Sequence, residues 1–381
     1  MKKVILFGLV LALLLCGCGA KQTDAPAKMD EAEAAVENTQ PADVETVAVE
    51  EIQEEIQEET TASTEPEIYR NPLNGEILDA PYTGRIFATT ISNMQENMPH
   101  VGANEADVIM EMYVNMNNVV RCLALFTDIE SVEAVGSTRS TRPIFNDIAQ
   151  HYDLILAHAG GSDTALEDAD NRGLDHYNVD SWTVSQSGAS YRDTQYKRSY
   201  ENSLFVSGPA LRAYAESEGA AMEVEKDYGF RFTENGTPAA GEGADKITLT
   251  FVYGQAKKDG SFVYNGELGK YVWNQYGKEM KDQITGELEA FTNVIIMQTV
   301  MSNSGIYHQA DFVSGGMGYY ANGGKLIPIV WACDDEDSAF RFMTTDAEPL
   351  EIGVGNTYIA IVTPESPVTW EALETAPQNA D

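Results

Sequence analysis

The loop at residues 136–142, Gly-Ser-Thr-Arg-Ser-Thr-Arg, carries residue types that bind an anion. Arg139 and Arg142 provide guanidinium groups, and hydroxyl groups accompany them on Ser137, Thr138, Ser140 and Thr141. An arginine holds a phosphate or carboxylate through two parallel hydrogen bonds, and a helix beginning at Pro143 would add its positive N-terminal end. Arg121, on the strand predicted before the loop, is expected to point to the same place. The candidate anion-binding residues are therefore Arg121, Ser137, Arg139, Ser140 and Arg142.

The same arginines and hydroxyls also suit a purely structural role. The arginines could pair with Asp107, Glu111 or Asp163, and the hydroxyls could cap the helix that follows the loop. The sequence leaves both alternatives open.

A second strand-to-helix turn, His158-Ala-Gly-Gly-Ser162, is a candidate neighbour of this loop, because ligands of α/β sheets gather beyond the carboxyl ends of strands. If the two turns are adjacent, the candidates lining their cleft are Asp107, Glu111, His158, Ser162, Asp163 and Arg192. A histidine beside a serine can activate a nucleophile, but the sequence has no Gly-x-Ser-x-Gly elbow. A hydrogen-bonded structural histidine is therefore the favoured interpretation, and no catalytic residue is assigned.

The sequence predicts no metal site and no cofactor. Its five histidines and four cysteines show no pattern with the spacing of zinc ligands. Cys122 and Cys333 lie inside apolar runs, where a cysteine usually packs as a small hydrophobic residue. A disulfide between them is the alternative for an extracytoplasmic protein.

The elements that must hold these loops alternate between strand and helix in the first half of the chain. Strands are predicted at residues 85–92, 107–114, 119–126, 132–135 and 153–159, with a hairpin turn at 115–118. Helices are predicted from Pro143 and after a capping Ser162. From residue 247 the pattern becomes a series of strands separated by turns such as Asn265-Gly266. We therefore expect an α/β (or α+β) N-terminal domain at 71–220, a connector at 221–245, a mostly β C-terminal domain at 246–370 and a flexible tail at 371–381.

Several segments together resemble the YerB family of Gram-positive lipoproteins, whose biochemical function is undetermined. The resemblance follows the same order through Asn71-Pro-Leu-Asn-Gly75, Ala106-Asp107 with Glu111, residues 136–142, His158 to Ser162, Tyr191-Arg-Asp193, Asn293 to Met297 and Gly316 to Trp331. It implies a lipid anchor and a module of two domains of unknown function, but no reaction. The chain departs from the family pattern at Asn115-Met-Asn-Asn118, where Glu-Gly-Gly is usual, and at Tyr200-Glu-Asn202, where Pro-His-Asn is usual.

The first twenty residues predict export and lipidation. Lys2 and Lys3 precede an apolar run of about a dozen residues, which is too short to span a bilayer but typical of a signal peptide. Leu15-Cys-Gly-Cys18 is similar to a lipobox, and the small Gly17 precedes Cys18. We expect a lipoprotein signal peptide at 1–17 and a lipid on Cys18, which would anchor the chain in the cell membrane on its extracytoplasmic face.

The remaining composition indicates an acidic tether followed by an acidic folded part. Residues 19–70 contain 15 acidic residues against three basic ones and are predicted, with Cys18, to form a disordered spacer. Residues 71–381 carry a net charge of −26. A surface of this kind disfavours nucleic acid as a partner, although a local basic site can exist within it.

Two functions fit these observations. The favoured one is a non-enzymatic module of the cell envelope that binds an envelope protein or a cell-wall precursor through the arginine-bearing pocket. The alternative is an envelope enzyme acting on pyrophosphate-linked precursors, because the order of elements resembles that of the LytR-CpsA-Psr phosphotransferases. Asp107 and Glu111 would then be the acids, and Arg121, Arg139 and Arg142 would hold pyrophosphate. A likeness of pattern alone says little about function.

Overall fold

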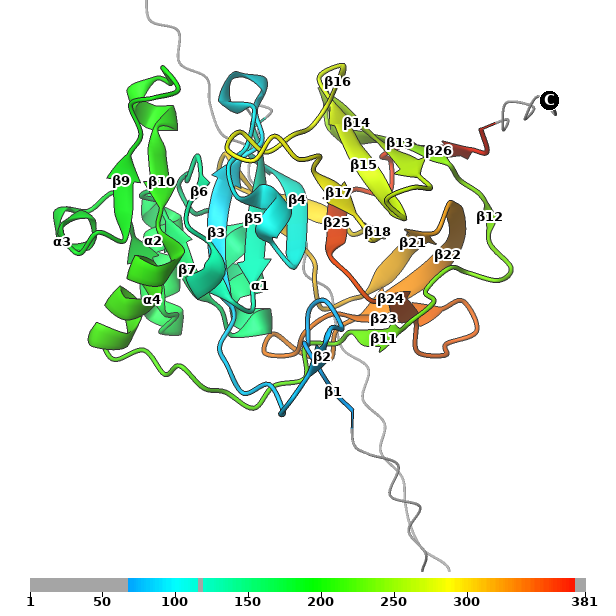
Figure 1. Cartoon of the computed structure of the whole chain (residues 1–381), viewed down its shortest axis with the longest axis horizontal. Coiled ribbons are helices and arrows are strands. Elements are labelled where there is room, and N and C mark those ends of the chain that lie inside the picture. Colours follow the sequence, from blue (N-terminus) through cyan, green and yellow to red (C-terminus); the bar gives the residue numbers. More distant parts are fainter. Residues whose placement is uncertain (1–67, 116–118, 374–381) are drawn as a thin grey trace, which may run out of the picture. The chain divides into compact units, whose positions relative to one another are not determined.

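The computed structural model describes residues 68–115 and 119–373 (Figure 1). The predicted signal peptide, Cys18 and nearly all of the acidic tether lie outside the described residues, as do residues 116–118 of the predicted hairpin turn and residues 374–381 of the predicted tail. None of the helices in the described part is long and apolar enough to cross a membrane.

A large mixed sheet forms the centre of the fold. The strands that follow one another across it are β12 (Glu242–Gly243), β22 (Lys325–Ala332), β21 (Gly316–Asn322), β18 (Asn293–Gln298), β25 (Thr357–Val362), β4 (Val108–Asn115), β5 (Val119–Phe126), β3 (Phe87–Ser92), β7 (Ile155–His158) and β8 (His176–Asn178). Three further strands attach beside this path: β19 (Met301–Ser304), β20 (Tyr307–Ala310) and β23 (Arg341–Thr344). Strands near the middle, such as β4 and β5, are almost entirely buried, as expected of apolar runs covered on both faces.

One parallel pair joins the two halves of the chain. β25 runs beside β4, with Thr357 opposite Val108 and Ala360 opposite Glu111. Figure 1 shows this contact between the cyan β4 and the red-orange β25. The hydrogen-bonded sheet is therefore continuous from the first half of the sequence to the second.

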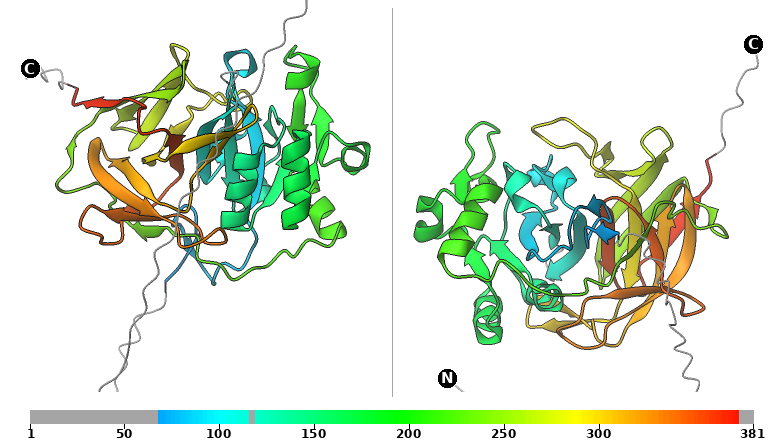
Figure 2. Two further views of the ribbon diagram at one scale, coloured as in Figure 1. Left: turned by 180° about the vertical axis from the view of Figure 1, so that it is seen from behind. Right: turned by 60° about the horizontal axis from the view of Figure 1, so that its bottom comes forward.

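Helices cover the first-half strands of this sheet. The helix α1 (Pro143–Tyr152) begins with proline at its first turn, as predicted, and buries Ile144, Phe145 and Ile148 against the sheet. It packs beside α2 (Asp163–Arg172), as Figure 2 shows. The Ser162 hydroxyl caps α2 by accepting a hydrogen bond from the Ala165 amide at 3.2 Å, which confirms the predicted cap. Two further helices, α3 (Trp182–Gln186) and α4 (Gly208–Ser217), follow.

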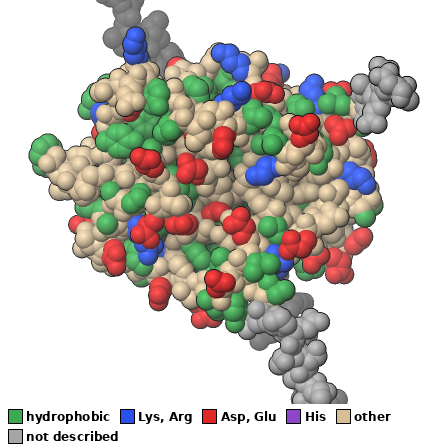
Figure 3. Space-filling view, in the orientation of Figure 1, with side chains coloured by type: hydrophobic (Ala, Val, Ile, Leu, Met, Phe, Trp, Pro, Cys, Tyr) green, Lys and Arg blue, Asp and Glu red, His purple; other side chains and the backbone are tan. Residues whose placement is uncertain are grey.

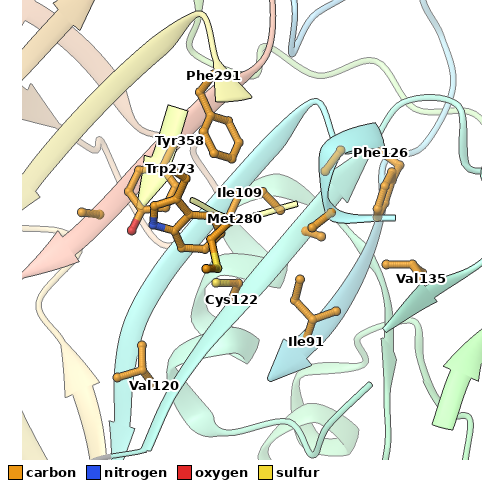
Figure 4. Close-up of a cluster of buried hydrophobic side chains, with 14 of the residues drawn as sticks. Ile91, Ile109, Val120, Cys122, Phe126, Val135, Trp273, Met280, Phe291 and Tyr358 are labelled. Carbon is orange, nitrogen blue, oxygen red and sulfur yellow. The ribbon is translucent and has the colours of Figure 1, made fainter. Parts of the chain in front are cut away.

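A second sheet packs on the other face of β4 and β5. Its strands in order are β16 (Lys278–Glu279), β15 (Lys270–Gln275), β14 (Ala256–Asn265), β13 (Lys246–Tyr253) and β26 (Val368–Glu371), with β17 (Ala290–Phe291) beside β15. Alternate residues of β13, namely Ile247, Leu249 and Phe251, are buried, which is the period of two expected for a sheet with one face on the core. Figure 4 shows Trp273 and Tyr358 from the two sheets meeting in this core.

Smaller elements complete the fold. One small sheet consists of β6 (Val135–Gly136), β10 (Leu204–Val206) and β9 (Ser190–Arg192). Two strand pairs are separate from it: β11 (Arg231–Thr233) with β24 (Glu351–Gly353), and β1 (Tyr69–Arg70) with β2 (Ile77–Leu78). Within the described ranges, four short 3-10 helices lie at η1 (Gln95–Asn97), η2 (Ala103–Glu105), η3 (Ile129–Ser131) and η4 (Tyr200–Asn202). The strand predicted at 132–135 is reduced to β6, because residues 132–134, which follow η3, pair with no other strand of the described chain.

The structure confirms the predicted fold class, with mixed α/β structure in the first half and mostly β structure in the second. Cys122 and Cys333 are both buried and unpaired, so the disulfide alternative is wrong. Cys122 lies on β5 in the core between the two sheets, where Figure 4 shows it among apolar side chains. Both cysteines therefore act as small buried side chains.

Candidate functional site

The two loops that the sequence analysis singled out lie side by side. The Thr141 amide donates to the Gly160 carbonyl and the Ala159 amide donates to the Arg139 carbonyl, both at 2.9 Å. These bonds join residues 139–141 to residues 159–161 in the manner of two parallel strands. The two loops therefore lie together where they lead into the first turns of α1 and α2.

A small pocket of about 230 Å³ opens where these loops meet β9 and η4. Three of the predicted residues, Arg139, Ser140 and Arg192, line it together. The remaining lining residues are Ala159, Asp180, Tyr200, Glu201 and Leu204. We call this cavity the arginine pocket.

Backbone carbonyls orient both arginines of the pocket, and one exposed carboxylate faces each. Arg139 donates to the carbonyl of Glu201, and its guanidinium lies 3.5 Å from the Glu201 carboxylate. Arg192 donates to the carbonyl of Tyr200 and to the carboxylate of Asp180. The Arg192 guanidinium also stacks 3.7 Å from the centre of the Tyr200 ring. The expected structural partners Asp107, Glu111 and Asp163 are not the ones that the arginines use.

Two further arginines lie behind the pocket. Arg121 is 5% exposed and donates to the carbonyl of Ser140. Burial, together with the neighbouring charges of Arg142 and Arg139, holds the pKa of Arg121 well below its usual value. Arg142 donates to the Thr141 carbonyl and lies 5.1 Å from the centre of the Tyr307 ring. The three arginines therefore form a local concentration of positive charge.

The hydroxyl groups of residues 136–142 do not converge on one point, because Ser137 and Thr141 bond to different neighbours. Ser137 donates to the carbonyl of Asn202 and accepts from Arg198 at 3.0 Å. Thr141 donates to the side chain of Asn146 at 3.1 Å. No side chain caps the start of α1, so the expected hydroxyl cap is absent from this helix of the described chain. Of the loop's hydroxyl residues, Ser140 is the one that lines the arginine pocket.

His158 is the first member of a hydrogen-bonded chain that ends at a carboxylate. Its Nδ1 lies 2.8 Å from the Gly160 carbonyl, and its Nε2 lies 2.9 Å from Nδ1 of His176. Because a carbonyl can only accept, Nδ1 of His158 donates and its Nε2 accepts from His176. The other nitrogen of His176 lies 3.0 Å from the Asp170 carboxylate. Burial lowers the pKa of His158 to about 4, which keeps this ring neutral.

The acids of the enzyme hypothesis lie elsewhere. The Asp107 carboxylate accepts from the amide and hydroxyl of Thr127, each at 2.7 Å, and from Asn74 at 2.6 Å. Thr127 follows Arg121 by six residues, which is roughly 20 Å along an extended chain. Glu111 pairs with Lys258 at 2.6 Å on the face of β4 opposite to Arg121. The structure therefore brings neither acid to the arginines.

The remaining predicted residues have local roles. Ser162 caps α2 and Asp163 is the exposed first residue of that helix. No group of three or more potential metal ligands occurs in the described ranges. Asp180, Tyr200 and Glu201 line the pocket but are not among the residues predicted from the sequence. Tyr200 and Glu201 could have been noticed in the sequence, because they lie in one of the two segments that depart from the family pattern.

Comparisons with known proteins agree with the resemblance seen in the sequence. Family models described as the N-terminal and C-terminal domains of a "Protein of unknown function (DUF3048)" match residues 73–221 and 248–359. The chain is 24% identical over 275 residues to "Putative lipoprotein YerB" of Bacillus subtilis (strain 168), covering 68% of this chain and 80% of that protein. A crystal structure of YerB protein from Bacillus subtilis is similar with a TM-score of 0.66 at 21% identity, over 79% of this chain and 99% of the other. The two proteins share a fold.

Proposed function

The chain belongs to the DUF3048 family of proteins of unknown function, and from that premise we propose that it is a lipid-anchored binding module of the cell envelope. Its relative is named as a lipoprotein, in keeping with the lipobox-like Leu15-Cys-Gly-Cys18. The arginine pocket is its recognition site. The ligand is a phosphate or carboxylate group on a cell-wall precursor or an envelope protein at the extracytoplasmic face.

The observation that carries this proposal is the convergence of arginines in a strongly acidic chain. Residues 71–381 have a net charge of −26, and acidic side chains outnumber basic ones on the face drawn in Figure 3. Arg139 and Arg192 nevertheless line one pocket, with Arg121 in contact with the backbone of Ser140 behind it. Anions concentrate where positive charge is gathered at a partly buried site.

The present partners of these arginines are easy to exchange for a ligand. The Glu201 side chain is 78% exposed and that of Asp180 is 45% exposed. Exposed ion pairs of this kind contribute only about 0–1 kcal/mol. An incoming phosphate or carboxylate can therefore replace either carboxylate at little cost, while the backbone carbonyls keep the guanidinium groups in place.

The family pattern suggests that the pocket differs among relatives. Tyr200 and Glu201 line it, and Asn202 accepts from Arg139 at 3.2 Å. The family resemblance gives Pro-His-Asn at these three positions. The first two positions, which vary, are the ones that line the pocket, whereas the asparagine that accepts from Arg139 is retained. Tyr200 and Glu201 therefore give the pocket of this chain a lining that differs from the family pattern.

The enzyme alternative receives less support from the geometry. A phosphotransferase of the LytR-CpsA-Psr type would need its acids and arginines around one substrate. Asp107 is instead bound to Thr127 and Asn74, and Glu111 is paired with Lys258. A binding role needs only the arginine pocket.

The proposal is tested by thermal unfolding of the full chain in detergent, with pyrophosphate and muramyl dipeptide as phosphate and carboxylate probes. A ligand at a hundred times its Kd stabilises the folded state by about 2.7 kcal/mol, which raises the melting temperature by several degrees. The double variant Arg139→Gln, Arg192→Gln should lose this rise. The matched control Arg231→Gln removes an exposed arginine paired with Asp227 and should keep it. No rise with either probe, or a rise that the double variant keeps, would contradict the proposal.

The anchor is tested separately by mass spectrometry of the protein recovered from membranes. We expect a mature chain that begins at an acylated Cys18. Recovery of the unmodified cysteine with the leader still attached would exclude the lipid anchor without bearing on the pocket.

A further inference from the structure

A second cavity, of about 760 Å³, is lined by residues of β13, β14, β15 and β16 in the second sheet and by Tyr113 and Val120 of the β4–β5 pair. It is unrelated to the arginine pocket, with which it shares no lining residue. The residues that line it include Tyr113, Lys246, Lys257, Lys258, Gln275 and Lys278. We call it the lysine cavity.

The charge of this cavity is opposite to that of the chain as a whole. Four of the nine lysines that follow residue 70 line it, and Asp259 is the single acidic residue in its lining. A random distribution over a surface of net charge −26 would not gather them in this way. The cavity is the local basic site that the composition allows.

The four lysines differ in whether a carboxylate already balances their positive charge. Lys258 is buried against Glu111 at 2.6 Å, and Lys246 faces the exposed Glu371 at 3.2 Å. Lys257 and Lys278 have no carboxylate partner within the part of the chain that the structure describes. The last two ammonium groups are therefore the ones available to an anion.

Two buried polar atoms beside the lysines also lack a partner among the described residues. The Tyr113 hydroxyl and the Gln275 Oε1 make no hydrogen bond, although each residue is only 2% exposed. The Gln275 amide nitrogen donates to Asn93 at 2.7 Å, which fixes the orientation that leaves Oε1 unused. Native proteins rarely leave such atoms unsatisfied, because each one costs about 1–3 kcal/mol. One donor and one acceptor on residues that line the cavity are therefore without a partner in the described chain.

A strained turn keeps one wall of the cavity in place. Tyr276, which occupies the first position of the two-residue turn between β15 and β16, has a φ of +53°, a conformation that bulky residues rarely adopt. Its hydroxyl donates to the Asn93 carbonyl at 2.8 Å, and its ring lies 5.5 Å from the Lys258 ammonium. Strain of this kind persists where the surroundings hold a side chain at a functional position.

We propose that the lysine cavity binds a polyol or sugar phosphate. Lys257 and Lys278 would hold the phosphate, the Tyr113 hydroxyl would donate to a ligand oxygen, and Gln275 Oε1 would accept from a ligand hydroxyl. The volume lies within the range of roughly 300–1,000 Å³ that small-molecule sites occupy. Such a ligand needs both the positive charge and the unused donor and acceptor, whereas a simple anion would use the charge alone.

The test is calorimetric titration of the full chain in detergent with glycerol 3-phosphate, inorganic phosphate and glycerol. We expect saturable binding of glycerol 3-phosphate that is tighter than that of inorganic phosphate and weakens with added salt. The variant Lys257→Ala, Lys278→Ala should weaken it about tenfold or more, whereas Lys325→Ala, which removes a half-buried lysine outside the cavity, should not.

Tyr113→Phe separates ligand binding from a structural role. The change removes a buried hydroxyl that has no partner, so stability should not fall, while the affinity for glycerol 3-phosphate should fall about tenfold. The proposal is overturned if no phosphate binds, if the double lysine variant binds as well as the parent, or if inorganic phosphate binds as tightly as glycerol 3-phosphate. Binding only to vesicles of phosphatidylglycerol would overturn it in favour of a membrane surface. The double arginine variant should leave the binding of glycerol 3-phosphate unchanged, and this result distinguishes the lysine cavity from the arginine pocket.

Discussion

The ion pair between Lys258 and Glu111 offers the sharpest test of how the two sheets are joined. Lys258 on β14 and Glu111 on β4 are 2.6 Å apart, and their side chains are 7% and 0% exposed. The Tyr358 hydroxyl on β25 donates to the other Glu111 oxygen. Replacing Lys258 with Met keeps most of the side chain's volume but removes the charge that balances the buried carboxylate.

The expected cost follows from what the substitution leaves behind. A buried charge that loses its partner destabilises a protein by about 3–5 kcal/mol, a large part of a total stability of about 5–15 kcal/mol. Replacing both residues, as Lys258→Met with Glu111→Leu, removes the charge altogether and is expected to be nearly neutral. The two single changes should therefore not add, and their coupling free energy should be about 3 kcal/mol or more.

The assay is urea unfolding of the parent, the two single variants and the double variant, followed through the fluorescence of tryptophan. Trp273 reports on this region, because its ring centre is 5.2 Å from that of Tyr358 (Figure 4). A loss below about 1 kcal/mol for Lys258→Met, or a double variant as unstable as the single one, would show that Lys258 does not balance the buried charge of Glu111. Either result would mean that water or another group compensates Glu111.

Three further substitutions test the arginine pocket, the cap of α2 and the buried His158. Glu201→Gln removes the carboxylate that competes for Arg139, so the affinity for pyrophosphate in calorimetry should rise about two- to fivefold, and an unchanged affinity would contradict the pocket. Ser162→Ala removes the cap of α2 and should cost about 1 kcal/mol in urea unfolding; a loss under a few tenths would show that the cap is dispensable. His158 has its pKa lowered from 6.5 to about 4, so the unfolded state binds its proton first as the pH falls. The neutral His158 therefore contributes up to about 3 kcal/mol of folding stability above pH 6.5, and this contribution is lost as the pH falls from 6.5 to 4. The variant His158→Gln should lose less stability than the parent over this interval in urea unfolding. Equal losses in the two proteins would contradict the lowered pKa of His158.

Local patterns predicted the elements well, because each one depends on neighbours in sequence. The apolar runs around β4 and β5, the proline at the start of α1 and the Ser162 cap are all visible without a structure. The pairing of β25 with β4 is not, because an apolar run of strand length does not specify which distant run it joins. The sequence therefore predicted two halves but not the continuous sheet.

The same limit explains which site residues were found. Arg139, Ser140 and Arg192 were selected by residue type, and the structure brings them to one pocket. Glu111 was assigned to a cleft, although an acid inside an apolar run more directly indicates a buried charge that requires a partner. Lys258 is 147 positions away, so nothing local could identify it. The lysine cavity was missed for the same reason, since its residues come from six different strands (β4, β5, β13, β14, β15 and β16) and a turn.

The hairpin of β4 and β5 sets the geometry of both proposed sites. Side chains alternate between the faces of a strand, so Tyr113, opposite Val120, faces the second sheet, whereas Arg121, opposite Met112, faces the loop of Ser140. A slip of one residue in this pairing would exchange the two faces, burying the arginine in the core between the sheets. Natural selection that preserves one site therefore also preserves the β4–β5 register on which the other site depends. This coupling is structural rather than allosteric, because each site can be emptied or filled without any change in the pairing of the two strands.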